Sequence, residues 1–314
     1  MSENVNTVMN ETQPSGCYWN HGAGKIGITL AYCLVFLVSL AGNTVIGIIV
    51  YKTKTMRKPI NFFIVNMAMS DLLFPIFLIP REIQLLYIDS WLIGGPLGQA
   101  LCKLVIFLSD VSLFVSILSL VLIAVDRFGA VVYPLRSPLI SSKLCLFFIL
   151  ATWIVAMAVQ SPKLFAYKLV EYPGGLLCEM RWNEAFGAFS FIENYYVSIL
   201  VVFIISPSVL IAILYIIIYL NLKSQKIPGE QPANAGQQGQ QRERNVLKMA
   251  IAIVLGFAMC WLPLAIWIIL VSFTDTIIWS NCAFRYFFLY CQFHGSGKLC
   301  HKSLYLFYFQ RKLS

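Results

Sequence analysis

A few polar and ionisable side chains lie inside long apolar runs of the sequence. Their presence in such an apolar environment requires an explanation. Asp71 lies within the run FIVNMAMSDLL, and Asn43 lies within SLAGNTVIG. An ionisable residue near the middle of a bilayer costs roughly 2.5–3.5 kcal/mol on insertion scales. A carboxylate with Asn and Ser partners can hold a small cation. Alternatively, each polar group completes a hydrogen-bond network between packed helices, and both interpretations stay open.

A second group of reactive residue types lies near the C-terminal end of the sequence, at Cys291, His294, Cys300 and His301. These side chains are ones that bind zinc, but their spacing within a membrane tail lacks the scaffold of a structural zinc site. We find no convincing nucleophile–base pair elsewhere. The sequence therefore predicts neither an enzyme nor a resident cofactor, a bound sodium ion excepted.

The elements that position these residues are apolar runs long enough to cross a bilayer. Of the 314 residues, 59% are hydrophobic and only 12% are charged, which is about half the charge of a soluble domain. A membrane-spanning helix needs ~20 apolar residues. Seven runs can be distinguished, at 26–50, 60–86, 100–125, 144–166, 193–220, 246–273 and 277–300. We therefore predict an all-α membrane protein, a seven-transmembrane helix bundle whose seventh run is the weakest.

Prolines inside these runs also suit membrane helices, because neighbouring helices and Ser or Thr side chains satisfy the backbone groups that proline frees. They are Pro75, Pro80, Pro162, Pro207 and Pro263.

The positive charge is concentrated in alternate loops, and this orients the bundle. A net charge of +9 could suggest nucleic-acid binding, but the basic residues follow the first, third and fifth runs. They are Lys52, Lys54, Arg57, Lys58, Arg136, Lys143, Lys223, Lys226, Arg242, Arg244 and Lys248. The positive-inside rule makes that side cytoplasmic. We predict an extracellular N-terminus with Asn10 glycosylated in the sequon Asn10-Glu11-Thr12, a lipid bilayer around the helices, and no nucleic-acid partner.

One membrane domain is expected, with polar segments at its edges. Residues 1–24 are predicted to form an extracellular tail without the apolar region of a signal peptide. Residues 25–300 form the transmembrane domain, and 301–314 form a short atypical C-terminal tail. Residues 221–245 are rich in Gln, Gly and Pro, cannot bury a core, and are expected to form a flexible third cytoplasmic loop.

Two pairs of cysteines lie on the predicted oxidising side of the membrane. Cys102 opens the third helix and Cys178 lies in the loop before the fifth. A bridge between them would tie that loop over the mouth of the bundle. Cys17 and Cys282 are also predicted outside and could form a second disulfide bond.

Distinctive residues and motifs occur one after another along the first six predicted helices. They are Asn43, Asp71, Cys102, the triplet Asp126-Arg127-Phe128, Trp153, Pro207 and the run Cys260-Trp261-Leu262-Pro263. Any one of these motifs is weak, whereas the ordered set over residues 25–290 is specific. It resembles the rhodopsin-like (class A) G-protein-coupled receptors.

The resemblance implies roles at three levels of the bundle. In the middle, the family's allosteric sodium site is matched by Asn43, Asp71 and Ser116. Below the ligand pocket, the packing switch is matched by Ile117, Pro207, Phe257, Trp261 and Pro263. At the cytoplasmic mouth, activation and contact with a heterotrimeric G protein are matched by Asp126, Arg127, Phe128, Pro134, Leu135, Tyr215 and Glu243. A buried guanidinium must be paired, so breaking the ion pairs of Arg127 would let the sixth helix move outward.

The third helix narrows the chemistry of the ligand. Ser109 stands where amine receptors of this family carry Asp, which argues against a biogenic amine. With Ser109, the candidate ligand-pocket residues are carboxylates predicted near the mouth: Glu82, Asp110, Glu179 and Glu193. We hypothesise that the ligand is a cationic neuropeptide, and amidated neuropeptides are included in this class. Alternatively, these carboxylates are ordinary solvated rim residues.

The seventh helix departs from the family pattern. Family members end this helix with Asn-Pro-x-x-Tyr, whereas no Asn-Pro follows residue 290. Back-translated codons of 298–314, when read one nucleotide later, make such a motif available. The leading prediction is a plasma-membrane receptor for an extracellular ligand, a neuropeptide, that signals to a G protein. The alternative is a truncated or frameshifted receptor-like membrane protein that does not signal.

Overall fold

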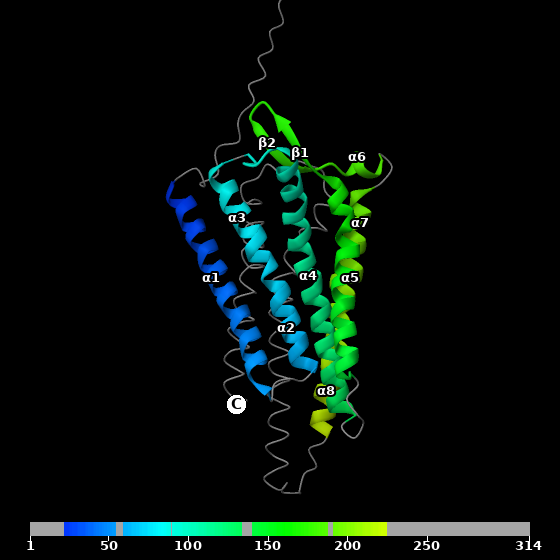
Figure 1. Ribbon diagram of the computed structural model, residues 1–314. Coiled ribbons are helices and arrows are strands. Elements are labelled where there is room, and N and C mark those ends of the chain that lie inside the picture. Colours follow the sequence, from blue (N-terminus) through cyan, green and yellow to red (C-terminus); the bar gives the residue numbers. More distant parts are fainter. Residues whose placement is uncertain (1–21, 55–58, 89, 134–139, 188–190, 225–314) are drawn as a thin grey trace, which may run out of the picture.

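The computed structural model describes residues 22–54, 59–88, 90–133, 140–187 and 191–224. Within them, five apolar helical spans are long enough to cross a membrane: Gly24–Lys52, Pro59–Tyr87, Gly95–Val132, Lys143–Ala166 and Asn194–Asn221. They confirm the first five predicted spans, and Figure 1 shows the helices running alongside one another. The predicted sixth and seventh spans lie outside the described residues.

Three of the five spans are single helices and two are interrupted. The continuous ones are α1 (Gly22–Lys52), α4 (Gly95–Val132) and α5 (Ser142–Ala166). The second span consists of α2 (Pro59–Asp71) and α3 (Leu73–Tyr87). Pro75 lacks the N–H that would bond to the carbonyl of Asp71, which explains why the helix is interrupted at Leu72.

The fifth span contains α7 (Ile192–Ile199), a π-helical turn (Leu200–Ile205) and α8 (Ser206–Ser224). The π-helical turn directly precedes Pro207, which cannot donate a backbone hydrogen bond. Because α8 continues to Ser224, its last turn occupies the start of the segment predicted as the third cytoplasmic loop. Similarly, α1 begins at Gly22, inside the predicted tail of residues 1–24.

Hydroxyl groups satisfy the backbone next to the internal prolines, as the membrane setting predicts. In α5, Pro162 cannot bond to the carbonyl of Ala158, and the Ser161 hydroxyl donates to that oxygen at 2.8 Å. In α8, the Ser208 hydroxyl donates to the carbonyl of Ile204 at 2.6 Å.

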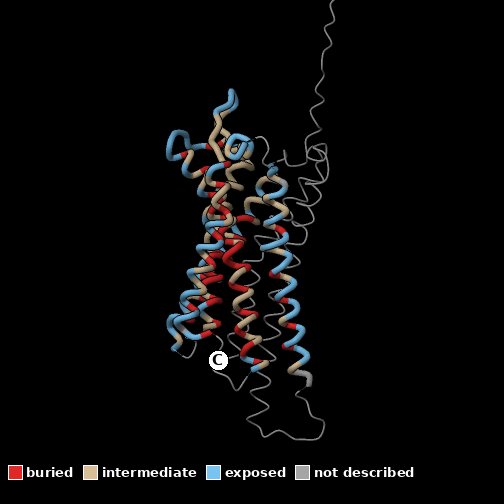
Figure 2. The backbone as a smooth tube through the Cα atoms, turned by 90° about the vertical axis from the view of Figure 1, so that its right-hand side faces the viewer, coloured by how far each residue is buried: buried red, intermediate tan, exposed pale blue. Residues whose placement is uncertain are grey.

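Helix α4 lies at the centre of the described bundle and contacts α2, α3, α5 and α8. Its apolar side chains Val111, Val115 and Ala124 are fully buried, as are Phe63 and Met67 of α2. Figure 2 shows buried segments along the inner helices and exposed ones on the outside.

The outward faces of α1, α5 and α8 remain strongly apolar. More than half of the surface of Leu30, Leu34, Phe147, Ile154 and Ile216 is exposed. Such faces are rare on soluble monomers, and lipid tails solvate them in a bilayer.

A β-hairpin covers one end of the bundle and was not predicted, since the sequence analysis assigned this segment only to the loop before the fifth helix. Strand β1 (Tyr167–Tyr172) pairs antiparallel with β2 (Gly175–Met180), from Tyr167 opposite Met180 to Tyr172 opposite Gly175. A short helix, α6 (Trp182–Phe186), follows. Figure 1 shows the hairpin over the start of α4, at the same end of the bundle as the start of α1.

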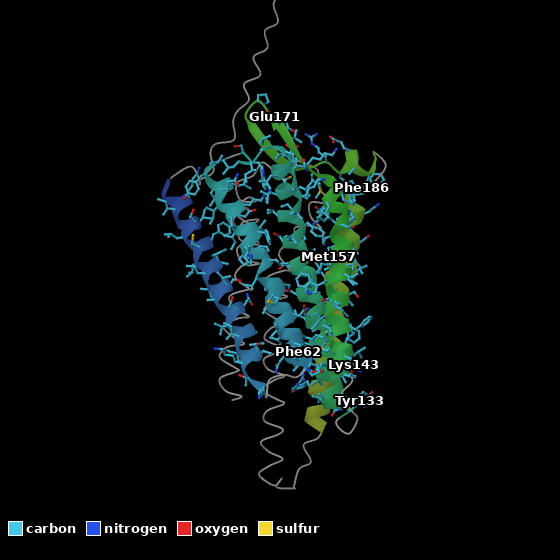
Figure 3. The ribbon with its side chains drawn as sticks, in the orientation of Figure 1. Phe62, Tyr133, Lys143, Met157, Glu171 and Phe186 are labelled. Carbon is cyan, nitrogen blue, oxygen red and sulfur yellow. A yellow bond between two sulfur atoms is a disulfide. The ribbon has the colours of Figure 1, made fainter. Side chains whose placement is uncertain are left out.

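The two ends of the bundle are distinct. Figure 3 labels Glu171 of the hairpin and Phe186 of α6 at one end, and Tyr133 and Lys143 at the opposite end. The last residue of α1, Lys52, also lies at the Lys143 end. This arrangement agrees with the predicted orientation, in which the basic end is cytoplasmic.

Candidate functional site

The outer end of the bundle is closed by a covalent and a hydrogen-bonded anchor between α4 and the hairpin. The disulfide Cys102–Cys178 joins α4 to β2 with a Cα–Cα distance of 5.6 Å, which confirms that prediction. The Gln99 side chain accepts from the backbone N–H of Leu169 at 2.9 Å and donates to the carbonyl of Tyr167 at 3.3 Å. The hairpin is therefore fixed over the start of α4.

Three of the four predicted carboxylates have an intramolecular cationic partner. Glu82 pairs with Arg81 at 3.0 Å, Asp110 with Lys163 at 2.5 Å, and Glu179 with Arg181 at 2.9 Å. These acidic groups are thus neither free nor simply solvated. The fourth candidate, Glu193, belongs to α7, and the structure does not describe its side chain.

The predicted pocket residue Ser109 is turned toward its own helix. Its buried hydroxyl donates to the carbonyl of Val105 at 2.6 Å. The neighbouring Asp110 instead reaches across to α5, where it meets Lys163.

Tyrosines surround the Asp110–Lys163 pair. The ammonium of Lys163 lies 5.5 Å from the centre of the Tyr196 ring, and the Tyr196 hydroxyl donates to the sulfur of Met180 in β2. The Tyr195 hydroxyl donates to the carbonyl of Val159 at 3.1 Å. Burial raises the pKa of the Tyr167 hydroxyl, with the nearby Tyr196 adding to the shift, so that this phenol stays neutral.

The middle of the bundle brings together two of the three residues assigned to the sodium site. Asp71 is buried and accepts a hydrogen bond from the Ser116 hydroxyl. Ser116 also shares a hydrogen bond of 3.1 Å with Ser70. Asn43 is buried in α1 and donates to the carbonyl and hydroxyl of Ser39, one turn earlier.

A polar junction one turn from Asp71 was missed by the sequence analysis. Asn66 donates to the hydroxyls of Ser119 at 2.9 Å and Thr152 at 3.3 Å, and its carbonyl oxygen accepts from the Trp153 indole at 2.8 Å. This single amide links α2, α4 and α5. The sequence singled out Trp153, but Asn66 could have been found as a second polar residue in the apolar run that contains Asp71.

At the cytoplasmic end, the predicted pairing of Arg127 is present. Its guanidinium donates to Asp126 Oδ2 at 2.5 Å from Nη2 and at 3.2 Å from Nε. Asp126 is almost fully buried, whereas Arg127 is about one quarter exposed. Phe128 packs edge-on against Tyr133, with ring centres 6.0 Å apart.

The described parts of the packing switch lie in the core. Ile117 of α4 and Tyr215 of α8 are buried in one apolar cluster. Pro207 is buried at the start of α8. Phe203 precedes it by four residues, and the rings of Phe203 and Phe114 pack edge-on with their centres 5.3 Å apart.

The remaining predicted residues lie outside the described part of the chain. They are Asn10, Cys17, Pro134, Leu135, Glu243, Phe257, Trp261, Pro263 and Cys282.

Comparison with known proteins places this geometry in context. The family model described as 7 transmembrane receptor (rhodopsin family) matches residues 42–299. The QRFP-like peptide receptor of Branchiostoma floridae is 35% identical over 245 residues, which cover 76% of this chain and 63% of that receptor. The RYamide receptor of Drosophila melanogaster is 29% identical over 273 residues (86% of this chain, 58% of that receptor). Neuropeptide FF receptor 1 of Rattus norvegicus is 29% identical over 284 residues (86% and 64%). The chain thus spans roughly three fifths of the length of these relatives.

Proposed function

Because the chain belongs to the rhodopsin family of seven-transmembrane receptors, we propose that it binds an extracellular peptide and signals to a heterotrimeric G protein. The chain is a multi-pass protein of the plasma membrane. Its family is one of receptors, and we propose no catalytic step for it.

The observation that supports this function best is the continuity of α4 between the two ends of the bundle. The helix carries Cys102 beneath the hairpin and the Asp126–Arg127 pair at the basic end. Its 38 residues make a rigid connection of about 57 Å, at 1.5 Å per residue. A ligand bound under the hairpin and a protein bound at Arg127 thus contact the same element.

The proposed mechanism is a shift between two states of the bundle. Asp126 neutralises Arg127 in the state described here. An agonist that binds the open state more tightly raises its population, and a G protein that contacts the freed guanidinium favours the same state.

The relatives support a peptide as the ligand. Their names refer to a QRFP-like peptide, to RYamide and to neuropeptide FF. Ser109, whose hydroxyl donates to its own helix, offers no anionic partner for a small amine.

The test is peptide-stimulated nucleotide exchange. Membranes from cells that express the chain are screened with a library of amidated and free-acid peptides, and GTPγS uptake and labelled-peptide binding are both measured. We expect at least one peptide to bind saturably and to stimulate exchange, and Arg127→Ala to abolish exchange while binding persists. Binding without exchange on the unsubstituted chain would support the alternative, a receptor-like protein that does not signal.

We further propose that Asp71 and Ser116, with Asn43, hold an allosteric sodium ion. The buried carboxylate and the adjacent hydroxyl oxygen supply the hard oxygen ligands that such a cation needs. If so, replacing potassium by sodium at constant ionic strength lowers agonist affinity on the unsubstituted chain. Asp71→Asn should remove this sodium dependence, whereas Ser198→Ala, at an exposed position of α7, should leave it unchanged.

A further inference from the structure

The ion pair between Asp110 and Lys163 connects two helices at the outer level of the bundle. Nζ of Lys163 lies 2.5 Å from Oδ2 of Asp110, and the two side chains are 9% and 29% exposed, respectively. Lys163 is thus the more deeply buried partner, one turn before the end of α5.

Lys163 is compensated from two directions. Asp110 supplies a full negative charge from α4, and the face of Tyr196 supplies a weaker attraction from α7. An isolated buried ammonium would cost several kcal/mol of desolvation. The opposite formal charges of Lys163 and Asp110 therefore cancel.

Asp110 retains one oxygen for a further contact. Lys163 occupies Oδ2, and Oδ1 receives no hydrogen bond from the residues that the structure describes. Since Asp110 is three times as exposed as Lys163, its carboxylate is the accessible side of the pair. A carboxylate oxygen in this position can accept a hydrogen bond from a ligand.

We propose that Lys163 determines ligand specificity: it neutralises Asp110, so that this subsite accepts an uncharged N–H or O–H donor of the peptide and does not select a cationic side chain. This inference rests on the proposed peptide-binding function. The sequence analysis predicted Asp110 as an acidic residue at the mouth of the bundle. In this proposal, Lys163 neutralises that carboxylate and holds it as a hydrogen-bond acceptor.

The first test measures the coupling of the pair without any ligand. The full chain is purified in detergent, and the thermal unfolding midpoint is compared for Lys163→Met, Asp110→Asn and the double variant. Each single change should lower the midpoint, and the double variant should recover most of the loss, because each single change leaves one charge of the pair without its partner. The loss should be larger for Asp110→Asn, which leaves the more deeply buried Lys163 unpaired. Additive losses would overturn the proposal.

A matched control is available on the surface of the same region. Lys168 and Glu184 form an ion pair at 2.9 Å, with side chains 44% and 50% exposed. Lys168→Met removes the same kind of charge from a solvated pair. Its midpoint should change far less than that of Lys163→Met, and equal shifts would contradict a special role for the buried pair.

The second test measures specificity. An agonist from the peptide screen is rescanned with each residue replaced in turn by arginine and by its neutral isostere citrulline, and competition binding is measured. On Lys163→Met, the arginine-to-citrulline affinity ratio should rise about tenfold or more at one peptide position, because the lone carboxylate then pairs with the cation. Lys163→Arg, which keeps the charge, should leave every ratio near that of the unsubstituted chain.

The outcomes separate the two proposals. Peptide binding with no shifted ratio on Lys163→Met would overturn the specificity role of Lys163 and leave the receptor function intact. A failure of every peptide to bind the unsubstituted chain would contradict the receptor function itself, and the specificity role with it.

Discussion

At the scale of single residues, several polar side chains inside this bundle are held by partners on other helices, whereas Asn43 and Ser109 bond within their own helix. Asn66 is the clearest case, because one amide receives or donates hydrogen bonds to three side chains on two neighbouring helices. A buried polar group that loses its partner costs its full desolvation penalty, about 1–3 kcal/mol, which exceeds the net contribution of the hydrogen bond itself. The positions of such residues therefore fix the rotation of each helix about its own axis.

We expect Asn66→Ala to lower the free energy of unfolding by about 1–3 kcal/mol, because it leaves the N–H of the Trp153 indole without its acceptor. Thermal unfolding of the purified chain in lipid–detergent micelles measures the effect. Asn194→Ala, at an exposed position, serves as the control and should change the midpoint little. Equal effects of the two substitutions would show that the Asn66 junction contributes no stability.

At the scale of elements, the hairpin is attached to the helices more firmly than a loop. One disulfide, the Gln99 bonds and the backbone bond from Arg181 to the carbonyl of Ala166 all act on it. Its strands, of six residues each, were missed because their alternation of apolar and polar residues is weak. The Pro-Gly-Gly sequence at residues 173–175 was the available turn signal.

Removing the disulfide should release the hairpin. Cys102→Ser is expected to cost about 2–5 kcal/mol of stability and to reduce peptide affinity, because β2 loses its link to α4. Binding isotherms and unfolding midpoints measure the two effects. Cys33→Ser changes an exposed free cysteine of α1 and should leave both quantities near their original values.

The link between the hairpin and α6 should respond weakly to pH. The hydrogen bond and charge of Lys168 lower the pKa of Glu184, so this carboxyl contributes stability above its unfolded pKa and loses it as pH falls through the folded pKa. We expect Glu184→Gln to lower the unfolding midpoint slightly at neutral pH and to have no effect once the pH is below that folded pKa. A difference that grew on acidification would contradict this sign.

At the scale of the whole molecule, the features that the sequence predicted correctly are those determined by the composition of a local segment. The first five spans could be predicted because a run of ~20 apolar residues has the length that a helix needs to cross a bilayer. The Cys102–Cys178 bond could be predicted because hydropathy places both cysteines on the same side of the membrane, and the structure confirms it. Lys163 as the partner of Asp110 was missed, since the two residues are separated by 53 positions in the chain. Such pairings depend on how α4 and α5 are rotated against each other, which hydropathy does not reveal.

The orientation of the whole chain can be checked through Asn10. We expect endoglycosidase treatment to increase the electrophoretic mobility of the expressed chain, and Asn10→Gln to abolish that change, because the positive-inside rule predicts an N-terminus outside the cell. Asn6→Gln, which alters no sequon, is the control. An N-terminal epitope that intact cells hide from antibody would contradict the predicted orientation.

The length of the spans has a consequence for how far the helices extend beyond the bilayer. The described spans run from 24 residues in Lys143–Ala166 to 38 residues in Gly95–Val132, or about 36–57 Å as helices. All exceed a hydrocarbon thickness of about 30 Å, so the helices must tilt or protrude, or the bilayer must thicken around them. The excess length carries the charged helix ends, such as Lys52 of α1 and Arg127 of α4, out of the hydrocarbon to the level where head groups and water solvate them.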